Sequence, residues 1–268
     1  MSRDHPLLTI EGLTVAFGGV KALDRVSFTL SAKRIAAVIG PNGAGKSTLF
    51  NCFSGLQVPT EGSVSWFGEK ITGESCRSLC DRGLARTFQN LALLPEATVE
   101  ENVLLGRYRH GSTGLLGAVI RGPSSRREER RQRQLAAAAI DGFGLSTVAE
   151  REVGTLSYGV RKKVEMARAL AQEPRLLLLD EPMAGIDGAE KPELSELIRR
   201  VAEERDLQVI MVEHDMNVIM GLAEEIVVLD FGKKIAHGTP GEIQSDPVVI
   251  EAYLGADFDL KAGDHQPA

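Results

Sequence analysis

The stretch Gly40-Pro41-Asn42-Gly43-Ala44-Gly45-Lys46-Ser47-Thr48 decides which fold this sequence predicts. It has the spacing G-x-x-x-x-G-K-[ST] and follows an apolar, β-branched run, residues 35–39, that indicates a buried strand. Glycines let the main chain curl so that successive N–H groups converge on an anion, and a helix beginning near Lys46 would direct its positive end at the same point. We therefore expect a phosphate-binding loop, in which Lys46 reaches the β- and γ-phosphates and Ser47 is a ligand of Mg²⁺. The alternative is a glycine-rich strand-to-helix turn that binds no ligand.

Composition and charge restrict the class of protein. Of the 268 residues, 43% are hydrophobic and 25% are charged, which is ordinary for a globular protein and excludes a disordered or fibrous chain. The formal net charge of −6 argues against a nucleic-acid partner. The basic run at residues 126–133 contains Glu128 and Glu129 at helical spacing, so we expect it to form an exposed helix face.

Cysteine usage and hydropathy favour a cytosolic location. Cys52, Cys76 and Cys80 lack C-x-x-C spacing and a neighbouring histidine cluster, so we expect reduced thiols. The first residues lack the apolar segment of a signal peptide, and no window reaches the roughly eighteen apolar residues of a membrane span. If the chain works at a membrane, another subunit must cross the bilayer.

The order of the predicted strands and helices indicates an α/β fold. Near-alternating apolar segments before residue 68 predict a small β-rich opening. Later apolar runs typical of buried strands alternate with segments of helical period, which favours a mostly parallel sheet covered by helices. The expected strands are residues 35–39, 83–88, 176–179, 209–212 and 226–229, and the expected helices are residues 47–54, 157–171 and 190–204. Such sheets bind ligands at the carboxyl ends of their strands, where Gly40, Asp180 and His214 fall.

Two adjacent carboxylates follow the four leucines at residues 176–179. A carboxylate at the end of a buried strand is costly unless it is paired, and Asp180 beside a nucleotide site would supply an oxygen ligand to Mg²⁺. Glu181 would then be the general base that orients and deprotonates the attacking water. The alternative is a helix N-cap pair that precedes Pro182.

Three further residues carry weaker signals. His214 follows an expected strand and could contact a γ-phosphate, although a lone histidine is more often a surface or packing residue. Gln89 could hold the catalytic water or Mg²⁺ through its amide, but glutamine is common in loops. Phe17 could stack on adenine or be a core aromatic at a strand end.

The segment Leu156-Ser157-Tyr158-Gly159-Val160 resembles the L-S-G-G-Q signature of ABC transporter ATPases. Tyr158 replaces a glycine and Val160 replaces the glutamine, whereas Ser157 and Gly159, the pair that approaches the phosphate in this family, are retained. The order and spacing of the other motifs agree with the family over about residues 7–255. The resemblance assigns Phe17 to the adenine-stacking aromatic, residues 40–48 to Walker A, Gln89 to the Q-loop, residues 176–180 to Walker B, Glu181 to the catalytic glutamate, Asp187 to the D-loop and His214 to the H-loop. It implies catalytic roles for Lys46, Gln89, Glu181 and His214, and places Ser47, Gln89 and Asp180 around Mg²⁺.

A narrower resemblance is to the ATP-binding subunits of branched-chain amino acid importers, with relatives for urea, amides and aromatic acids. It is carried by the tyrosine in the signature and by residues 17–23, 86–89, 213–216, 238–240 and 252–255. The resemblance implies an α/β P-loop NTPase of the ABC ATPase type, with a mostly parallel core sheet, an antiparallel β subdomain and a helical subdomain. We expect one ATPase domain at residues 1–258, with the helical subdomain inserted at about residues 90–172, and a polar tail at residues 259–268.

The function implied by the resemblance is ATP hydrolysis that powers an importer, for branched-chain or other amino acids, with ATP and Mg²⁺ bound. The expected partners are a second ABC ATPase subunit, whose ATP site Ser157 and Gly159 complete, two membrane-spanning permease subunits and, indirectly, an extracytoplasmic solute-binding protein. A groove within residues 89–110 would receive a permease helix, so the chain would lie peripherally on the cytoplasmic face of the cell membrane. The alternatives are the ATPase of a lipid or lipopolysaccharide export system and a soluble ABC scaffold of the iron–sulfur assembly type. Whether the paired subunit is a second copy or a paralogue stays open.

Overall fold

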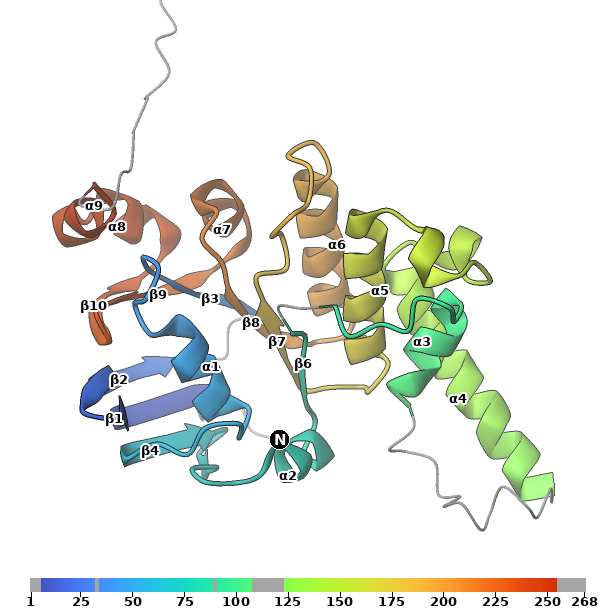
Figure 1. The fold of residues 1–268 in the computed structure, drawn as a ribbon, viewed down its shortest axis with the longest axis horizontal. Helices are drawn as coiled ribbons and strands as arrows, with labels where there is room; N and C mark the ends of the chain where they lie inside the picture. The colour runs from blue at the N-terminus through green and yellow to red at the C-terminus, as the bar shows by residue number, and fades with distance from the viewer. Residues whose placement is uncertain (1–5, 32–33, 89–90, 108–122, 255–268) are drawn as a thin grey trace, which may run out of the picture.

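The computed structural model describes residues 6–31, 34–88, 91–107 and 123–254, and its largest sheet has six strands (Figure 1). In spatial order these strands are β10 (Lys233–Gly238), β9 (Glu225–Asp230), β3 (Ile35–Ile39), β8 (Gln208–Val212), β7 (Leu176–Asp180) and β6 (Leu84–Arg86). The five strands from β9 to β6 are parallel, and β10 pairs antiparallel with β9 at one edge. The strand that precedes the glycine-rich loop, β3, is therefore central in the sheet.

A second, antiparallel sheet is formed mainly by the beginning of the chain. Its strands, in spatial order, are β2 (Val20–Leu30), β1 (Leu8–Phe17), β4 (Glu61–Trp66) and β5 (Glu69–Lys70). Helix α1 (Lys46–Phe53) lies between this sheet and the larger one (Figure 1). Its buried Leu49, Phe50 and Phe53 join a core to which both sheets contribute.

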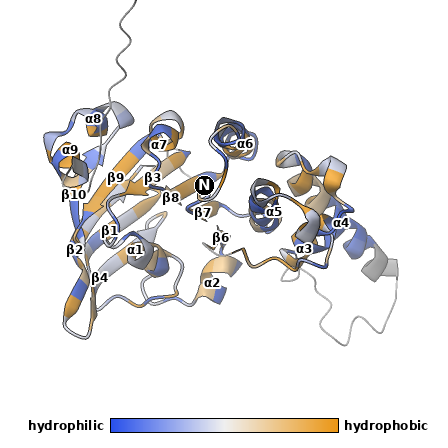
Figure 2. Ribbon diagram, turned by 45° about the horizontal axis from the view of Figure 1, so that its top comes forward, coloured by the Kyte–Doolittle hydropathy of each residue, from blue (hydrophilic) through white to orange (hydrophobic). Residues whose placement is uncertain are grey.

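Both faces of the larger sheet are covered, which explains the apolar runs in β3, β7, β8 and β9. In β3, Ala36 and Val38 face the core that contains α1, whereas Ile35, Ala37 and Ile39 face the core on the other side. Figure 2 shows β9 as hydrophobic along most of its length. The helices that contribute buried residues to the second core include α5 (Tyr158–Leu170), α6 (Lys191–Glu204), α7 (Met216–Leu222), α8 (Pro240–Ser245) and α9 (Pro247–Leu254).

A group of helices extends to one side of the sheets (Figure 1). It contains α3 (Val99–Leu105) and α4 (Pro123–Gly142), which pack against each other and against α5, with the short 3-10 helices η1 (Ser146–Val148) and η2 (Val153–Thr155) between α4 and α5. Thr98 and Glu101 form a capping box that fixes the start of α3. The basic run predicted to be an exposed helix face lies in α4, where exposed Arg133 contacts Glu129 one turn earlier at 3.3 Å. That prediction is confirmed.

Several elements differ from the sequence-based expectation. Helix α2 (Cys76–Asp81), strand β10 and helices α7 to α9 were not predicted. Strand β6 is shorter than the expected residues 83–88, because it lies at the edge of the sheet and pairs only with β7. The three cysteines are not joined by disulfides. Within the described ranges, no helix combines the length and the apolar character that crossing a bilayer would require.

Candidate active site

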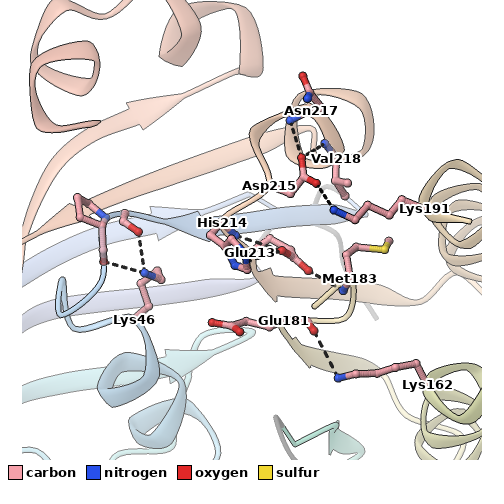
Figure 3. A network of polar contacts seen from close by, with 12 residues as sticks. Lys46, Lys162, Glu181, Met183, Lys191, Glu213, His214, Asp215, Asn217 and Val218 are labelled. Atoms are coloured by element: carbon pink, nitrogen blue, oxygen red, sulfur yellow. Dashed lines mark hydrogen bonds and ion pairs between the residues drawn. The ribbon is translucent and has the colours of Figure 1, made fainter. Parts of the chain in front are cut away.

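The ends of three neighbouring parallel strands bring together Lys46, Glu181 and His214, three of the four predicted catalytic residues. Strands β3, β8 and β7 are adjacent and in register, with Val212 paired to both Val38 and Asp180. The segments that follow these strands therefore meet at one edge of the sheet. Figure 3 shows Lys46, Glu181 and His214 at this edge.

The loop between β3 and α1 has a conformation that requires glycine. Gly40, Gly43 and Gly45 have φ of 150°, 81° and 98°, in the region that L side chains rarely adopt. A Cβ at Gly40 would lie 2.0 Å from the carbonyl oxygen of Leu229, and one at Gly45 would lie 2.5 Å from that of Ala22. No side chain caps α1, so the main-chain N–H groups of its first turn are presented to the loop. This cradle fits a phosphate group.

Lys46 lies inside the same loop. Its side chain is largely buried, and Nζ donates hydrogen bonds to the carbonyl oxygens of Gly40 at 2.6 Å and Pro41 at 2.8 Å (Figure 3). Burial lowers the pKa of Lys46, and the nearby Glu181 carboxylate acts in the opposite direction. The ammonium is therefore held where a phosphate bound to the loop would meet it.

Asp180, at the end of β7, forms a buried ion pair that sequence reasoning missed. Its Oδ2 is 2.7 Å from a terminal nitrogen of Arg86 on β6, and the two side chains are 8% and 7% exposed. The other terminal nitrogen of Arg86 donates to Asn51 Oδ1 at 2.8 Å and to Ser54 Oγ at 2.7 Å. The main-chain N–H of Asp180 donates to Thr87 Oγ1 at 3.2 Å. Arg86 thus compensates the Asp180 carboxylate, and a role for Asp180 as a ligand of Mg²⁺ stays a prediction.

Glu181 has a strained main chain. Its φ of 48° is in the left-handed region, which is unusual for a residue other than glycine. Its N–H donates to the carbonyl oxygen of Val212 at 2.9 Å, and its own carbonyl oxygen accepts a hydrogen bond from Lys162 Nζ at 3.4 Å. Figure 3 shows the Glu181 carboxylate directed toward Lys46.

Glu213, directly before His214, is the second functional residue that sequence reasoning missed. Its side chain is fully buried, and its carboxylate accepts hydrogen bonds from the main-chain N–H groups of Met183 at 2.7 Å and His214 at 3.1 Å. Burial raises the pKa of Glu213, whereas these two hydrogen bonds act to lower it. The His214 ring is 59% exposed, with Nδ1 3.8 Å from Glu213 Oε2. Glu213 thus joins the segments after β7 and β8.

Of the two remaining predicted residues, the structure describes Phe17 but not Gln89. Phe17 ends β1 and is 52% exposed, so the alternative of a core aromatic is wrong, and stacking on adenine stays a prediction. Gln89 lies outside the described residues.

The sequence matches a family model described as "ABC transporter" over residues 23–184, more than half of the chain. The chain belongs to the ABC transporter family. A second family model, described as "Branched-chain amino acid ATP-binding cassette transporter", matches residues 233–259.

Individual proteins of this family are similar to almost the whole chain. The chain is 41% identical over 255 residues to the high-affinity branched-chain amino acid transport ATP-binding protein BraF of Pseudomonas aeruginosa, covering 95% of this chain and 99% of that protein. It is 38% identical over 251 residues to LivG of Escherichia coli, which has the same description, covering 94% and 98%. Among solved structures, it is similar to the ADP conformation of MJ1267, an ATP-binding cassette of an ABC transporter, with a TM-score of 0.79, 30% identity and coverage of 93% and 99%. The expected ABC ATPase fold is therefore confirmed, and the chain is an ATPase of an ABC transport system.

The ABC signature segment lies at the start of α5 and contacts the segment after β7. Ser157 is the exposed N-cap of α5, and its Oγ accepts a hydrogen bond from the N–H of Val160 at 3.4 Å. The Tyr158 ring lies against Gly185, where a Cβ would be 2.9 Å from Cε1 of the ring. Asp187, assigned to the D-loop, accepts a hydrogen bond from the N–H of Ala189 at 2.9 Å.

Proposed function

We propose that this ABC ATPase hydrolyses ATP at the sheet edge formed by residues 40–48, 180–181 and 213–214, and thereby powers uptake of branched-chain amino acids. The observation that carries the catalytic assignment is the convergence of Lys46, Glu181 and His214 on one edge of the sheet (Figure 3). The amino acid assignment is supported by the names of BraF and LivG, to which the chain is similar over almost its whole length.

The phosphate loop and Lys46 would hold the nucleotide. The main chain approaches too closely at Gly40 and Gly45 for any side chain, which suits a loop that surrounds phosphate oxygens. Lys46 would exchange its bonds to main-chain carbonyl oxygens for stronger, charge-assisted bonds to phosphate. Ser47, Asp180 and Gln89 would hold Mg²⁺, which would neutralise charge on the phosphate oxygens. Phe17, exposed at the end of β1, would stack on adenine.

Glu181 is the proposed general base and His214 the proposed contact to the γ-phosphate. The main-chain bonds of Glu181 to Val212 and Lys162 hold its carboxylate on the side of the loop. Glu213 holds the main chain of His214 while the imidazole stays exposed at the edge. In phosphoryl transfer, such positioning together with electrostatic stabilisation supplies most of the catalysis.

The complete site is proposed to need a second ABC ATPase subunit. Ser157 is exposed at the N-terminus of α5, where the hydroxyl and the positive end of the helix suit an anion. We assign this segment, with the main chain of Gly159, to the γ-phosphate bound by the partner subunit. Hydrolysis would remove the contacts that hold the pair closed, and so drive a membrane partner between two states.

A surface near the start of the helical group is the proposed contact to a permease. Phe88, Leu94 and Leu105 are 42%, 53% and 39% exposed, so each leaves apolar surface that a partner could cover. Phe88 directly precedes the segment 89–110 that was predicted to form a groove, and Leu94 and Leu105 lie within it. A permease helix bound there would place the chain peripherally on the cytoplasmic face of the membrane.

Reconstitution with neighbouring gene products tests this function. The chain would be expressed together with the permease, ATPase and receptor genes adjacent to its own gene, purified, and placed in liposomes with the receptor. We expect ATP-dependent uptake of leucine, isoleucine or valine that the Glu181→Gln complex lacks. Hydrolysis without uptake of these amino acids would refute the substrate assignment, and recovery with cluster-assembly proteins in place of permeases would refute the transport assignment. Full hydrolysis by the Glu181→Gln complex would refute the catalytic assignment.

A further inference from the structure

Lys162 is a buried cation to which neither the ABC motifs nor the proposed catalysis gives a role. It lies in α5, two residues after the end of the predicted signature segment, and it is 1% exposed. An ammonium group removed from water is costly unless polar groups compensate it. Its Nζ donates to the carbonyl oxygen of Glu181 at 3.4 Å (Figure 3), and its charge also acts on buried Glu165 in the next turn.

The hydrogen bond reaches the main chain at its most strained point in the site. With φ of 48°, Glu181 adopts a conformation that costs of order 1–3 kcal/mol and persists only where surrounding contacts enforce it. The N–H of Glu181 donates to the carbonyl oxygen of Val212 on the side of β8. Its own carbonyl oxygen accepts a hydrogen bond from the N–H of Ala184 at 3.2 Å in the same turn and one from Lys162 Nζ at 3.4 Å, the latter on the side of α5. Both polar groups of the Glu181 peptide backbone are thus held, from opposite sides.

The contact is one of three between the first turns of α5 and residues 181–190. Tyr158 and Lys162 are four positions apart in the sequence, so they lie on one face of the helix. The Tyr158 ring covers Gly185, and a Cβ at Gly159 would lie 2.5 Å from Glu190 Oε2. Helix α5, which Ser157 begins, is therefore packed directly on the segment that carries the proposed base.

We propose that Lys162 is a positioning residue that holds the main chain of Glu181 and ties it to the helix that begins at the signature. This inference rests on the proposed role of Glu181 as the general base. Lys162 acts through the direction of the Glu181 carboxylate. Without it, the Glu181 turn keeps its main-chain bonds to Val212 and Ala184 but loses its link to α5, and the carboxylate shifts from its position beside the phosphate loop.

The test compares Lys162→Met, Lys162→Arg and the control Lys163→Met in the assembled transporter. Lys163 is the next residue of α5 and pairs with Glu193 at 2.6 Å, away from the site. Lys162→Met should lower kcat by about tenfold to a hundredfold, the cost of misplacing a reacting group by about 1 Å. Nucleotide affinity of the chain should stay within about twofold, because no bond to the nucleotide is removed. Lys162→Arg should restore most of the turnover, and Lys163→Met should leave it unchanged.

Accumulation of an ATP-bound pair of subunits gives a second readout. Lys162→Met should accumulate this pair, as Glu181→Gln is expected to do, because both bind ATP and hydrolyse it slowly. Wild-type turnover in Lys162→Met would overturn the proposal. A parallel loss of thermal stability and ATP affinity in Lys162→Met would also overturn it, because this would indicate a purely structural role. The same holds if Lys162→Arg folds but hydrolyses ATP as slowly as Lys162→Met. If Glu181→Gln hydrolyses ATP at the wild-type rate, the proposed function itself fails, whatever the Lys162 variants do.

Discussion

Replacing Arg86 with methionine should destabilise the fold by about 3–5 kcal/mol, the typical cost of removing one partner from a buried ion pair. The substitution leaves the Asp180 carboxylate, 8% exposed, without the cation that lies 2.7 Å away. It also removes the bonds to Asn51 and Ser54 of α1. Methionine fills much of the same volume, so the loss reflects charge and hydrogen bonding more than a cavity. Urea unfolding is followed by the fluorescence of Trp66, the only tryptophan, which is 2% exposed.

The control is the same substitution at an exposed ion pair. Arg199 lies 2.6 Å from Glu196, but the two side chains are 39% and 68% exposed, so Arg199→Met should cost less than about 1 kcal/mol. Adding Asp180→Asn to the Arg86 variant removes the uncompensated charge and should recover at least about 1 kcal/mol. The reasoning is refuted if Arg86→Met is no more destabilising than Arg199→Met, or if the added Asn recovers nothing.

Glu181→Gln should retain ATP binding and nearly abolish turnover, which equilibrium binding and phosphate release would show; unchanged turnover would exclude a base role. Ser157→Arg should spare nucleotide binding by the single chain and stop hydrolysis by the pair, and full activity would argue against a site completed by two subunits. Burial acts to raise the pKa of Glu225, but hydrogen bonds from Ser31 and His237 leave it below the ordinary 4.5. Glu225 therefore stabilises the fold at neutral pH, and this stabilisation is lost as pH falls below 4.5 through the lowered pKa. Ser31→Ala should reduce the urea midpoint at neutral pH and have little effect in acid; an equal loss at both would contradict this sign.

The glycine-rich loop could be predicted because its chemistry is local. Each glycine in residues 40–45 occupies a conformation or a close approach that other residues do not tolerate, so the spacing itself encodes the geometry. The buried strands β3 and β7 could be predicted equally well, since both faces of the sheet are covered and every position before Asp180 is apolar. The edge of the sheet that carries the candidate active site could be predicted from the rule that ligands bind at the carboxyl ends of parallel strands.

The partners of the buried carboxylates could not be predicted, because they are distant in sequence. Arg86 is 94 residues from Asp180, and Ser31 is 194 residues from Glu225. Any arginine or lysine could have compensated Asp180, and only the order of β6 beside β7 selects Arg86. Lys162 stands between Arg161 and Lys163, and nothing in the sequence distinguishes it from these two neighbours. Its burial depends on how α5 packs against the segment after β7, which periodicity does not specify.

Asp180 and Glu181 are held by different cations, because Asp180 is the last residue of β7 and Glu181 begins the turn that follows it. The Asp180 side chain points toward α1, where Arg86 joins it to Asn51 and Ser54 of the helix that begins with Lys46. At Glu181 the strand ends in a left-handed turn, which directs the carboxylate to the phosphate loop and the carbonyl oxygen to α5. Arg86 thus acts on a side chain, whereas Lys162 acts on the main chain. Loss of Arg86 should therefore be seen first in stability, and loss of Lys162 first in turnover.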